Sequence, residues 1–198
     1  FVNRLYGSLK EHTNIDFKFW CQTEDASGID SNIRIIPLKH VDPQKERYHK
    51  ISLLRSELLI GKCVSFDLDI IINRNIDHYL TVESERLLLL YSSFKDPKTI
   101  GRSNAGKTQF KDCVINSSIF SWTAHSDNTK RILEKHSETP YELYRHSFDR
   151  FLFWECVKEI ATFKFDDFCS YKYQGFQKEK TFCIFNGVKD KNFMRQFW

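Results

Sequence analysis

The sequence is poor in the features that mark linkers, repeats and membrane spans. Its 198 residues include only 7 glycines and 4 prolines, and they contain no Gly/Ser/Pro-rich tract and no internal repeat. No apolar run approaches the roughly 20 residues that a helix needs to cross a bilayer. Hydrophobic residues make up 41% and charged residues 28%, which excludes wholesale disorder. We therefore predict a single globular domain over residues 1–198.

Positively and negatively charged residues are present in similar numbers, and the cysteines form no motif. Thirty Lys and Arg residues are scattered among 26 acidic ones, giving a net charge of +4, so we expect no nucleic-acid partner. This charge would also suit peripheral contact with an anionic membrane, without arguing for one. The six cysteines include no CxxC pair, and most lie in apolar runs. They indicate buried thiols in a reducing compartment, and we expect a cytoplasmic protein.

Apolar periodicity predicts helices and strands that alternate along the chain. The expected helices cover residues 2–12, 51–59, 127–136 and 149–161, the third capped by Ser126 or Asp127. The expected strands cover residues 17–22, 33–38, 63–68, 87–91, 115–122 and 181–185. This order predicts an α/β fold with a single, mostly parallel sheet flanked by helices, because parallel strands need helical crossovers. In such sheets ligands bind beyond the carboxyl ends of the strands.

Two carboxylates, Asp67 and Asp69, interrupt an apolar stretch at residues 64–72. In a strand they would point to the same side, and burying both without a partner would be costly. A bound Mg²⁺ or Mn²⁺ would resolve this conflict and would keep coordination positions for a diphosphate. The alternative is that the strand has already ended, so that both side chains are solvated or cap the next turn.

Seven segments in order along nearly the whole chain carry a family resemblance. They are residues 2–6 (VNRLY), 19–25 (FWCQTED) with 28–30 (GID), 35–38 (IIPL), 49–51 (HKI), 66–72 (FDLDIII) with 75–77 (NID), 115–120 (INSSIF) and 184–189 (IFNGVK). The set resembles bacterial glycosyltransferases of the GT-A type, close to the retaining family-8 group. The second segment is similar to that family's C-x-T-D-D-x-x-G-L-D turn, and the fifth to its L-D-L-D-x-V-I-x-x-x-I-D motif.

The resemblance implies a GT-A-like nucleotide-diphospho-sugar transferase fold and a metal-dependent activity. The implied reaction moves a sugar from a nucleotide-diphosphate sugar, usually a UDP-sugar, to a hydroxyl of a saccharide or lipid-linked acceptor. By the same resemblance Mn²⁺ or Mg²⁺ is held by Asp67, Asp69 and Asn186, and Asp149 is the catalytic or sugar-positioning residue. The implied donor-binding residues are Thr23, Asp25, Lys50, Asp67, Asn116 and Ser117.

Several residues also have an ordinary structural interpretation, and the chain departs from the family pattern. Asn116 and Ser117 suit polar positions at a strand end, Lys50 suits solvent, and Asp149 suits a helix cap. The family's late His, often a third metal ligand, is Asn186 here. The family's first strand precedes its opening helix, where this sequence begins, so the strand is lost or the sequence is a fragment. A catalytically inactive relic of the fold is therefore one alternative.

A second alternative comes from Gly101–Thr108, which fits the phosphate-binding pattern G-x-x-x-x-G-K-[ST]. Such a P-loop should follow a strand directly and open a helix. Here residues 96–99 separate it from the preceding strand, and residues 109–115 show no helical periodicity. The sequence also lacks the D-x-x-G and N-K-x-D motifs of a GTPase. This context favours a loop beside the donor or acceptor site over a P-loop nucleotide-binding protein.

Overall fold

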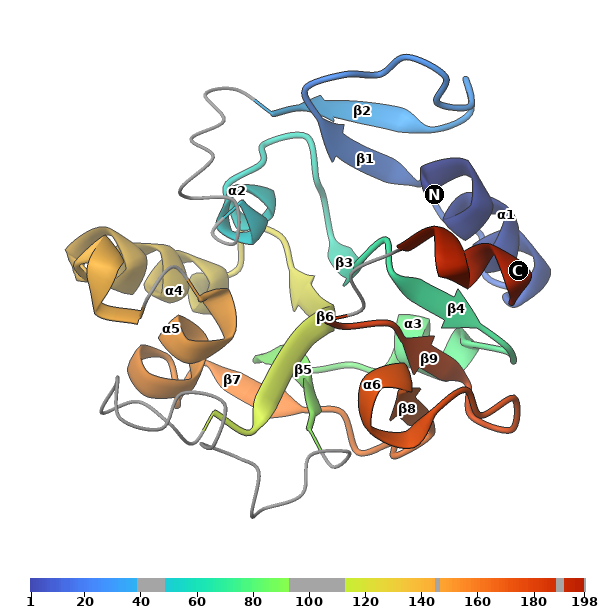
Figure 1. The fold of residues 1–198 in the computed structure, drawn as a ribbon. Coiled ribbons are helices and arrows are strands. Elements are labelled where there is room, and N and C mark those ends of the chain that lie inside the picture. The colour runs from blue at the N-terminus through green and yellow to red at the C-terminus, as the bar shows by residue number, and fades with distance from the viewer. Residues whose placement is uncertain (39–48, 93–112, 145–146, 188–190, 198) are drawn as a thin grey trace. The chain divides into compact units, whose positions relative to one another are not determined.

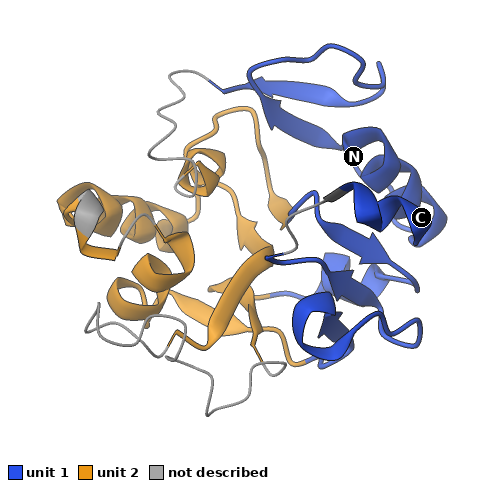
Figure 2. Cartoon of the chain, viewed as in Figure 1, with its two compact units in different colours: residues 1–38, 66–83, 165–198 blue, residues 39–65, 84–164 orange. Residues whose placement is uncertain are grey.

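The chain divides into two interleaved compact units (Figure 2). The computed structural model describes residues 1–38, 49–92, 113–144, 147–187 and 191–197. Unit 1 comprises residues 1–38, 66–83 and 165–198, and unit 2 comprises residues 39–65 and 84–164. The single domain expected from the sequence stays a prediction. The motif Gly101–Thr108 lies outside the described residues.

Unit 1 contains short strands and helices from three separate parts of the sequence (Figure 1). Its elements are α1 (Val2–Glu11), β1 (Trp20–Thr23), β2 (Arg34–Pro37), β4 (Ile70–Ile72), α3 (Asp77–Thr81), β8 (Phe168–Ser170), α6 (Tyr171–Gln174), β9 (Phe182–Ile184) and the 3-10 helix η4 (Lys191–Gln196). Strands β1 and β2 pair in parallel. Strand β9 lies between β8, which is parallel to it, and β4, which is antiparallel.

Unit 2 is built around a four-stranded sheet in the order β3-β6-β5-β7. Its elements are α2 (Lys50–Leu54), β3 (Lys62–Phe66, whose last residue belongs to unit 1), β5 (Leu87–Tyr91), β6 (Ile115–Thr123), α4 (Asp127–Glu138), the 3-10 helix η3 (Tyr141–Tyr144), α5 (Phe148–Glu155) and β7 (Ile160–Thr162). Strand β5 pairs with β6 in antiparallel and with β7 in parallel.

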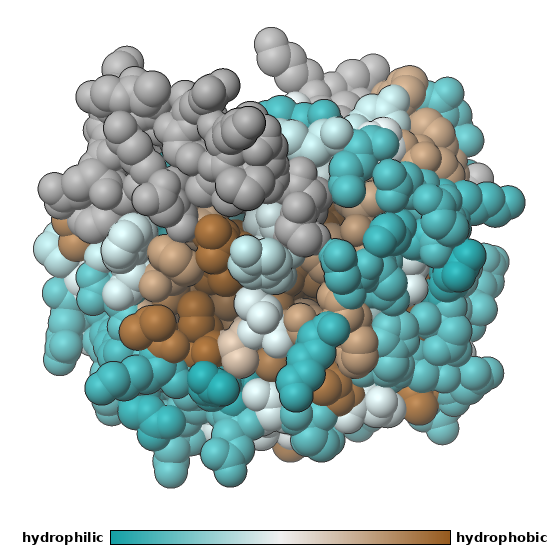
Figure 3. All heavy atoms as spheres, turned by 90° about the horizontal axis from the view of Figure 1, so that it is seen from below, coloured by the Kyte–Doolittle hydropathy of each residue, from teal (hydrophilic) through white to brown (hydrophobic). Residues whose placement is uncertain are grey.

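Each unit has its own apolar core because each buries its own large side chains. In unit 1 Tyr79 and Phe182 are fully buried, and their rings meet edge-on at 4.8 Å between centroids. In unit 2 Phe120 is fully buried and stacks on Trp122 at 5.0 Å. Large apolar side chains also remain exposed, Ile60 (84%) most of all, and Figure 3 shows one face on which hydrophobic residues gather among hydrophilic ones.

The mixed α/β class expected from the sequence is confirmed, but the single, mostly parallel sheet is wrong for the described residues. The strands form three sheets, with both parallel and antiparallel neighbours. The reason lies at the acidic pair, where the chain leaves β3 of one sheet, turns, and enters β4 of another. Among the described helices, none is long and apolar enough to span a bilayer.

The helix expected over residues 149–161 is too long by half a dozen residues. Helix α5 ends at Glu155, and Ile160–Thr162 form strand β7 beside β5. The apolar run there fits a strand as well as a helix, and pairing with Leu87–Leu89 decides between them. Apolar periodicity also missed the short elements β4, α3, β8 and α6.

Candidate functional site

In unit 1 one edge of the three-stranded sheet carries two of the predicted metal ligands, Asp69 and Asn186. Strands β8 and β9 are parallel, with Ser170 opposite Ile184, so their carboxyl ends reach the same edge. Strand β4 runs the other way and begins there, with Ile70 opposite Ile184. Asp69 therefore precedes β4 at the edge where Asn186 follows β9. This is the edge at which α/β sheets usually bind ligands.

The acidic pair lies in a turn rather than within a strand. Strand β3 ends at Phe66, and Asp67 and Asp69 occupy the connection to β4, both half-buried. The strand has thus ended before the pair, as one of the two interpretations made from sequence expects, but neither side chain is fully exposed, and the metal site stays a prediction. The backbone carbonyl of Asp69 accepts a hydrogen bond from Phe185 N at 2.8 Å, which holds the turn against the end of β9.

The third predicted ligand, Asn186, is held by a residue that the sequence analysis missed. Ser170 is fully buried at the end of β8, and its Oγ donates to Asn186 Oδ1 at 2.6 Å. An amide oxygen has two lone pairs, so this bond orients Oδ1 and leaves it able to accept again. The sequence signal that could have found Ser170 is a polar residue ending a short apolar run, Phe168–Ser170.

The donor set at this edge fits a hard cation. Two carboxylates and one amide oxygen are ligands of the kind that Mg²⁺ and Mn²⁺ take, and Mg²⁺ commonly needs only one or two carboxylates plus water and substrate phosphate. Among the described residues, no cluster of three or more His, Cys, Asp or Glu side chains could hold a metal.

Thr23 and Asp25 form a local turn after β1. Asp25 N donates to Thr23 Oγ1 at 3.1 Å, and Ser27 N donates to Asp25 Oδ1 at 2.8 Å. Hydrogen bonds from the Ser27 side chain and then from its backbone lower the pKa of Asp25. The turn continues to Gly28, whose carbonyl accepts from Asn3 Nδ2 of α1 at 2.8 Å. These bonds account for both side chains structurally, and their donor-binding role stays a prediction.

In unit 2 three of the predicted residues meet at Ser117. The β5–β6 register jumps from Leu89 opposite Phe120 to Leu90 opposite Asn116, which leaves residues 117–119 of β6 without a counterpart on β5. Such a bulge interrupts the ladder and re-aims side chains, and bulges are frequent beside active sites. Ser117 is buried, so its backbone groups need other partners.

Lys50 and Asp149 supply those partners. Lys50 Nζ donates to Ser117 O at 2.8 Å and lies 3.1 Å from its Oγ, and Ser117 N donates to Asp149 Oδ1 at 3.0 Å. The interpretation of Asp149 as a helix cap is wrong, because Ser147 accepts from Arg150 N and caps α5. The half-buried Lys50 is likewise not simply in solvent.

The neighbouring Asn116 is buried and turned toward its own strand. Its Oδ1 accepts a hydrogen bond from Ser118 N at 2.9 Å. The structure places the predicted residues in two units, and hydrogen bonds join Lys50, Ser117 and Asp149 to one another. Asp67, Asp69 and Asn186 belong to unit 1, and Lys50, Asn116, Ser117 and Asp149 belong to unit 2.

Comparison with known proteins gives a likeness in structure and none in sequence. No family model matches the chain, and no curated protein is similar to it in sequence. A solved structure matches with a TM-score of 0.53 and 10% identity, covering 83% of this chain and 82% of the other. That structure is described as a glycosyltransferase involved in the glycosylation of the major capsid of PBCV-1. This chain shares its fold. At 10% identity the likeness establishes the fold alone, so any activity has to be argued from the residues of this chain.

Proposed function

We propose that the chain is a glycosyltransferase that uses a nucleotide-diphosphate sugar, with UDP-sugar as the expected donor and a saccharide or lipid-linked hydroxyl as acceptor. The observation that carries the proposal is the carboxyl-end edge in unit 1, where Asp69 and Asn186 flank the end of β9. The shared fold with a glycosyltransferase supports it. The bacterial origin and cytoplasmic location implied by the resemblance belong to this proposal.

In this proposal Asp67, Asp69 and Asn186 hold Mn²⁺ or Mg²⁺, and Ser170 fixes the amide of Asn186. A bound divalent cation supplies electrostatic stabilisation of the negative charge that develops on the departing diphosphate. Asp149 keeps its predicted role near the reacting sugar, with Ser117, Asn116 and Lys50 as donor contacts. Asp149 Oδ1 is fixed by Ser117 N, which would hold the carboxylate in one orientation.

The first test of this proposal is binding of UDP with Mn²⁺, measured as thermal stabilisation and by calorimetry. A ligand at one hundred times its Kd should add about 2.7 kcal/mol to the free energy of unfolding. We expect this gain in the wild type and its loss in Asp69→Asn, which removes the charge and keeps the shape. Asp127→Asn is the matched control, because Asp127 is exposed on α4.

Three outcomes separate the alternatives. Stabilisation by UDP and Mn²⁺ that persists in Asp69→Asn would contradict the metal site. Stabilisation by GTP and Mg²⁺ that is lost in Lys107→Ala would favour the P-loop alternative, whose residues lie outside the described ranges. No metal-dependent binding of either nucleotide would favour the inactive relic. Where UDP binds, release of UDP from a panel of UDP-sugars then identifies the donor.

A further inference from the structure

A lysine side chain lies across the glycine that follows Asn186. A Cβ built on Gly187 would come within 3.3 Å of Lys172 Cδ and 3.7 Å of Lys172 Nζ. Gly187 also has a φ of +72°, a conformation that other residues rarely adopt. The missing side chain thus leaves space that the lysine stem fills, and the ammonium lies beside the turn at Asn186–Gly187.

The topology places this ammonium at the edge of the predicted metal ligands. Lys172 lies in α6, directly after β8, and Gly187 follows β9, so both come after parallel strands that end together. Hydrogen bonds also hold this segment together. The backbone N of Ser170 donates to Gln174 Oε1 at 3.1 Å, and Ser170 Oγ donates to Asn186 Oδ1. All of these residues belong to unit 1.

The charges at this edge leave a role for a protein cation. Two carboxylates and a divalent cation cancel formally, so the charge of a bound diphosphate would remain uncompensated. Sites that transfer or release phosphate groups commonly combine a metal ion with a lysine for this reason. The exposed ammonium of Lys172 lies 5.2 Å from the centroid of the Tyr173 ring, a cation–π contact at the surface.

We propose that Lys172 binds the diphosphate of the donor. Gly187, which has no side chain, leaves the space in which the Lys172 side chain lies beside the turn. This inference rests on the proposed function, and it names a contact that the sequence resemblance did not indicate. The proposal predicts that the Lys172 ammonium has opposite effects on the binding of a diphosphate and of a divalent cation at this edge of the sheet. The positive charge should attract a diphosphate, and it should repel a bare divalent cation.

The test uses Lys172→Gln in the full chain, with UDP, inorganic pyrophosphate and Mn²⁺ alone as probes. Losing one charge-assisted hydrogen bond should weaken UDP and pyrophosphate binding in the presence of Mn²⁺ by about tenfold or more. The affinity for Mn²⁺ alone, measured from the electron paramagnetic resonance signal of the free ion, should be unchanged or higher. Lys172→Arg should keep much of the diphosphate affinity.

The matched control is Lys178→Gln, an exposed lysine on the same segment between β8 and β9, which should bind all three probes as the wild type does. Equal diphosphate binding by Lys172→Gln and wild type would overturn the inference, and so would a parallel loss of Mn²⁺ and diphosphate, which would indicate a structural role. If wild type binds pyrophosphate but not UDP, the UDP donor is wrong and pyrophosphate still tests Lys172. If wild type binds neither, both proposals fall.

Discussion

Ser117 has a structural part at its position that is independent of its predicted contact with the donor. The bulge in β6 removes its partners on β5, and charged side chains from α2 and α5 take their place. These partners bind mainly the backbone N and O of Ser117, so the fold needs Lys50 and Asp149 here, whatever their part in binding. The hydrogen bonds of Lys50 and Asp149 explain why those residues are half-buried rather than free in solvent.

We expect His136 to make the stability of the protein depend on pH. Burial, and then the positive charge of Arg55, lowers the pKa of His136 from 6.5 to about 4. Arg55 NH2 lies 3.3 Å from His136 Nδ1, and the Phe151 ring meets the imidazole edge-on. The neutral ring accepts from Arg55, whereas a protonated ring would repel it.

Because the pKa in the folded state lies below the unfolded value, the stabilising contribution is complete above pH 6.5 and is lost as the pH falls towards 4. We expect the free energy of unfolding of wild type to fall by about 1 kcal/mol more over this range than that of His136→Gln, allowing for the partial exposure of the ring. Urea unfolding at a series of pH values measures this difference. Parallel pH profiles for the two proteins would contradict it.

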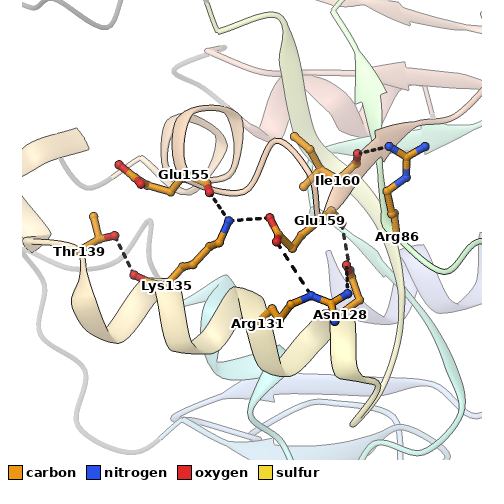
Figure 4. Close-up of polar contacts among 8 residues, drawn as sticks. All are labelled: Arg86, Asn128, Arg131, Lys135, Thr139, Glu155, Glu159 and Ile160. Atoms are coloured by element: carbon orange, nitrogen blue, oxygen red, sulfur yellow. Dashed lines mark hydrogen bonds and ion pairs between the residues drawn. The ribbon is translucent and has the colours of Figure 1, made fainter.

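At the scale of elements, a buried carboxylate joins α4 to the end of α5. Glu159 is 5% exposed, and its Oε2 accepts from Lys135 Nζ at 2.8 Å (Figure 4). Lys135 also donates to the carbonyl of Glu155, and Asn128 donates to the carbonyl of Glu159. The network thus supplies hydrogen-bond donors to the carbonyl of Glu155 at the end of α5 and to the carbonyl of Glu159 in the loop that leads into β7.

Lys135→Met should destabilise the protein because it leaves the Glu159 carboxylate buried, with Arg131, 4.0 Å away, as its remaining ion-pair partner among the described residues. We expect a loss of about 2 kcal/mol in the free energy of unfolding, since removing one partner of a buried pair exposes the desolvation cost of the other. Denaturant titration measures it. Lys130→Met, which removes an exposed pair with Asp127, should change stability by less than about 0.5 kcal/mol. Equal effects of the two variants would contradict the role of Glu159.

At the scale of the whole molecule, neither unit is a continuous stretch of sequence. The chain passes from one unit to the other after residues 38, 65, 83 and 164. Each unit therefore depends on contacts between distant segments, such as Asp69 with Phe185 in unit 1 and Lys50 with Ser117 in unit 2. Deleting any one segment would remove a strand or a helix from one of these cores.

All six cysteines are free thiols, and the fold divides them into two classes. Cys156, Cys169 and Cys183 are fully buried, whereas Cys21, Cys63 and Cys113 are half-buried. Burial raises the pKa of Cys156 to about 12. A hydrogen bond between the Cys169 and Cys183 thiols, together with burial, raises the pKa of Cys183, and the same hydrogen bond lowers that of Cys169. The expectation of buried thiols thus holds for half of them.

We expect iodoacetamide to modify the half-buried class first in the native protein, because the reagent cannot reach the fully buried thiols. Burial also raises the pKa of Cys21, and it raises that of Cys63 to about 11, so access rather than ionisation separates the two classes. In denaturing guanidinium all six should react. Mass spectrometry of the labelled peptides over time measures the order. Early labelling of Cys156, or protection of any cysteine after unfolding, would contradict the assignment.

The sequence by itself determined the elements that have strong local signals. Residues 2–12, 87–91 and 115–122 were predicted as a helix and two strands, close to α1, β5 and β6, because their apolar spacing is regular. It also indicated Asp67 and Asp69 as a pair, because carboxylates within an apolar stretch are unusual.

Only the tertiary structure decided which strands pair and which polar residues meet. Ile160–Thr162 is a strand because β5 lies beside it, and Ser170 reaches Asn186 because β8 and β9 end at the same edge. These pairings and hydrogen bonds join segments that are far apart in the sequence, whereas apolar periodicity reports only the spacing within one segment. Lys172 lies beside Gly187 for the same reason, since pairing of parallel strands fixes which chain ends come together.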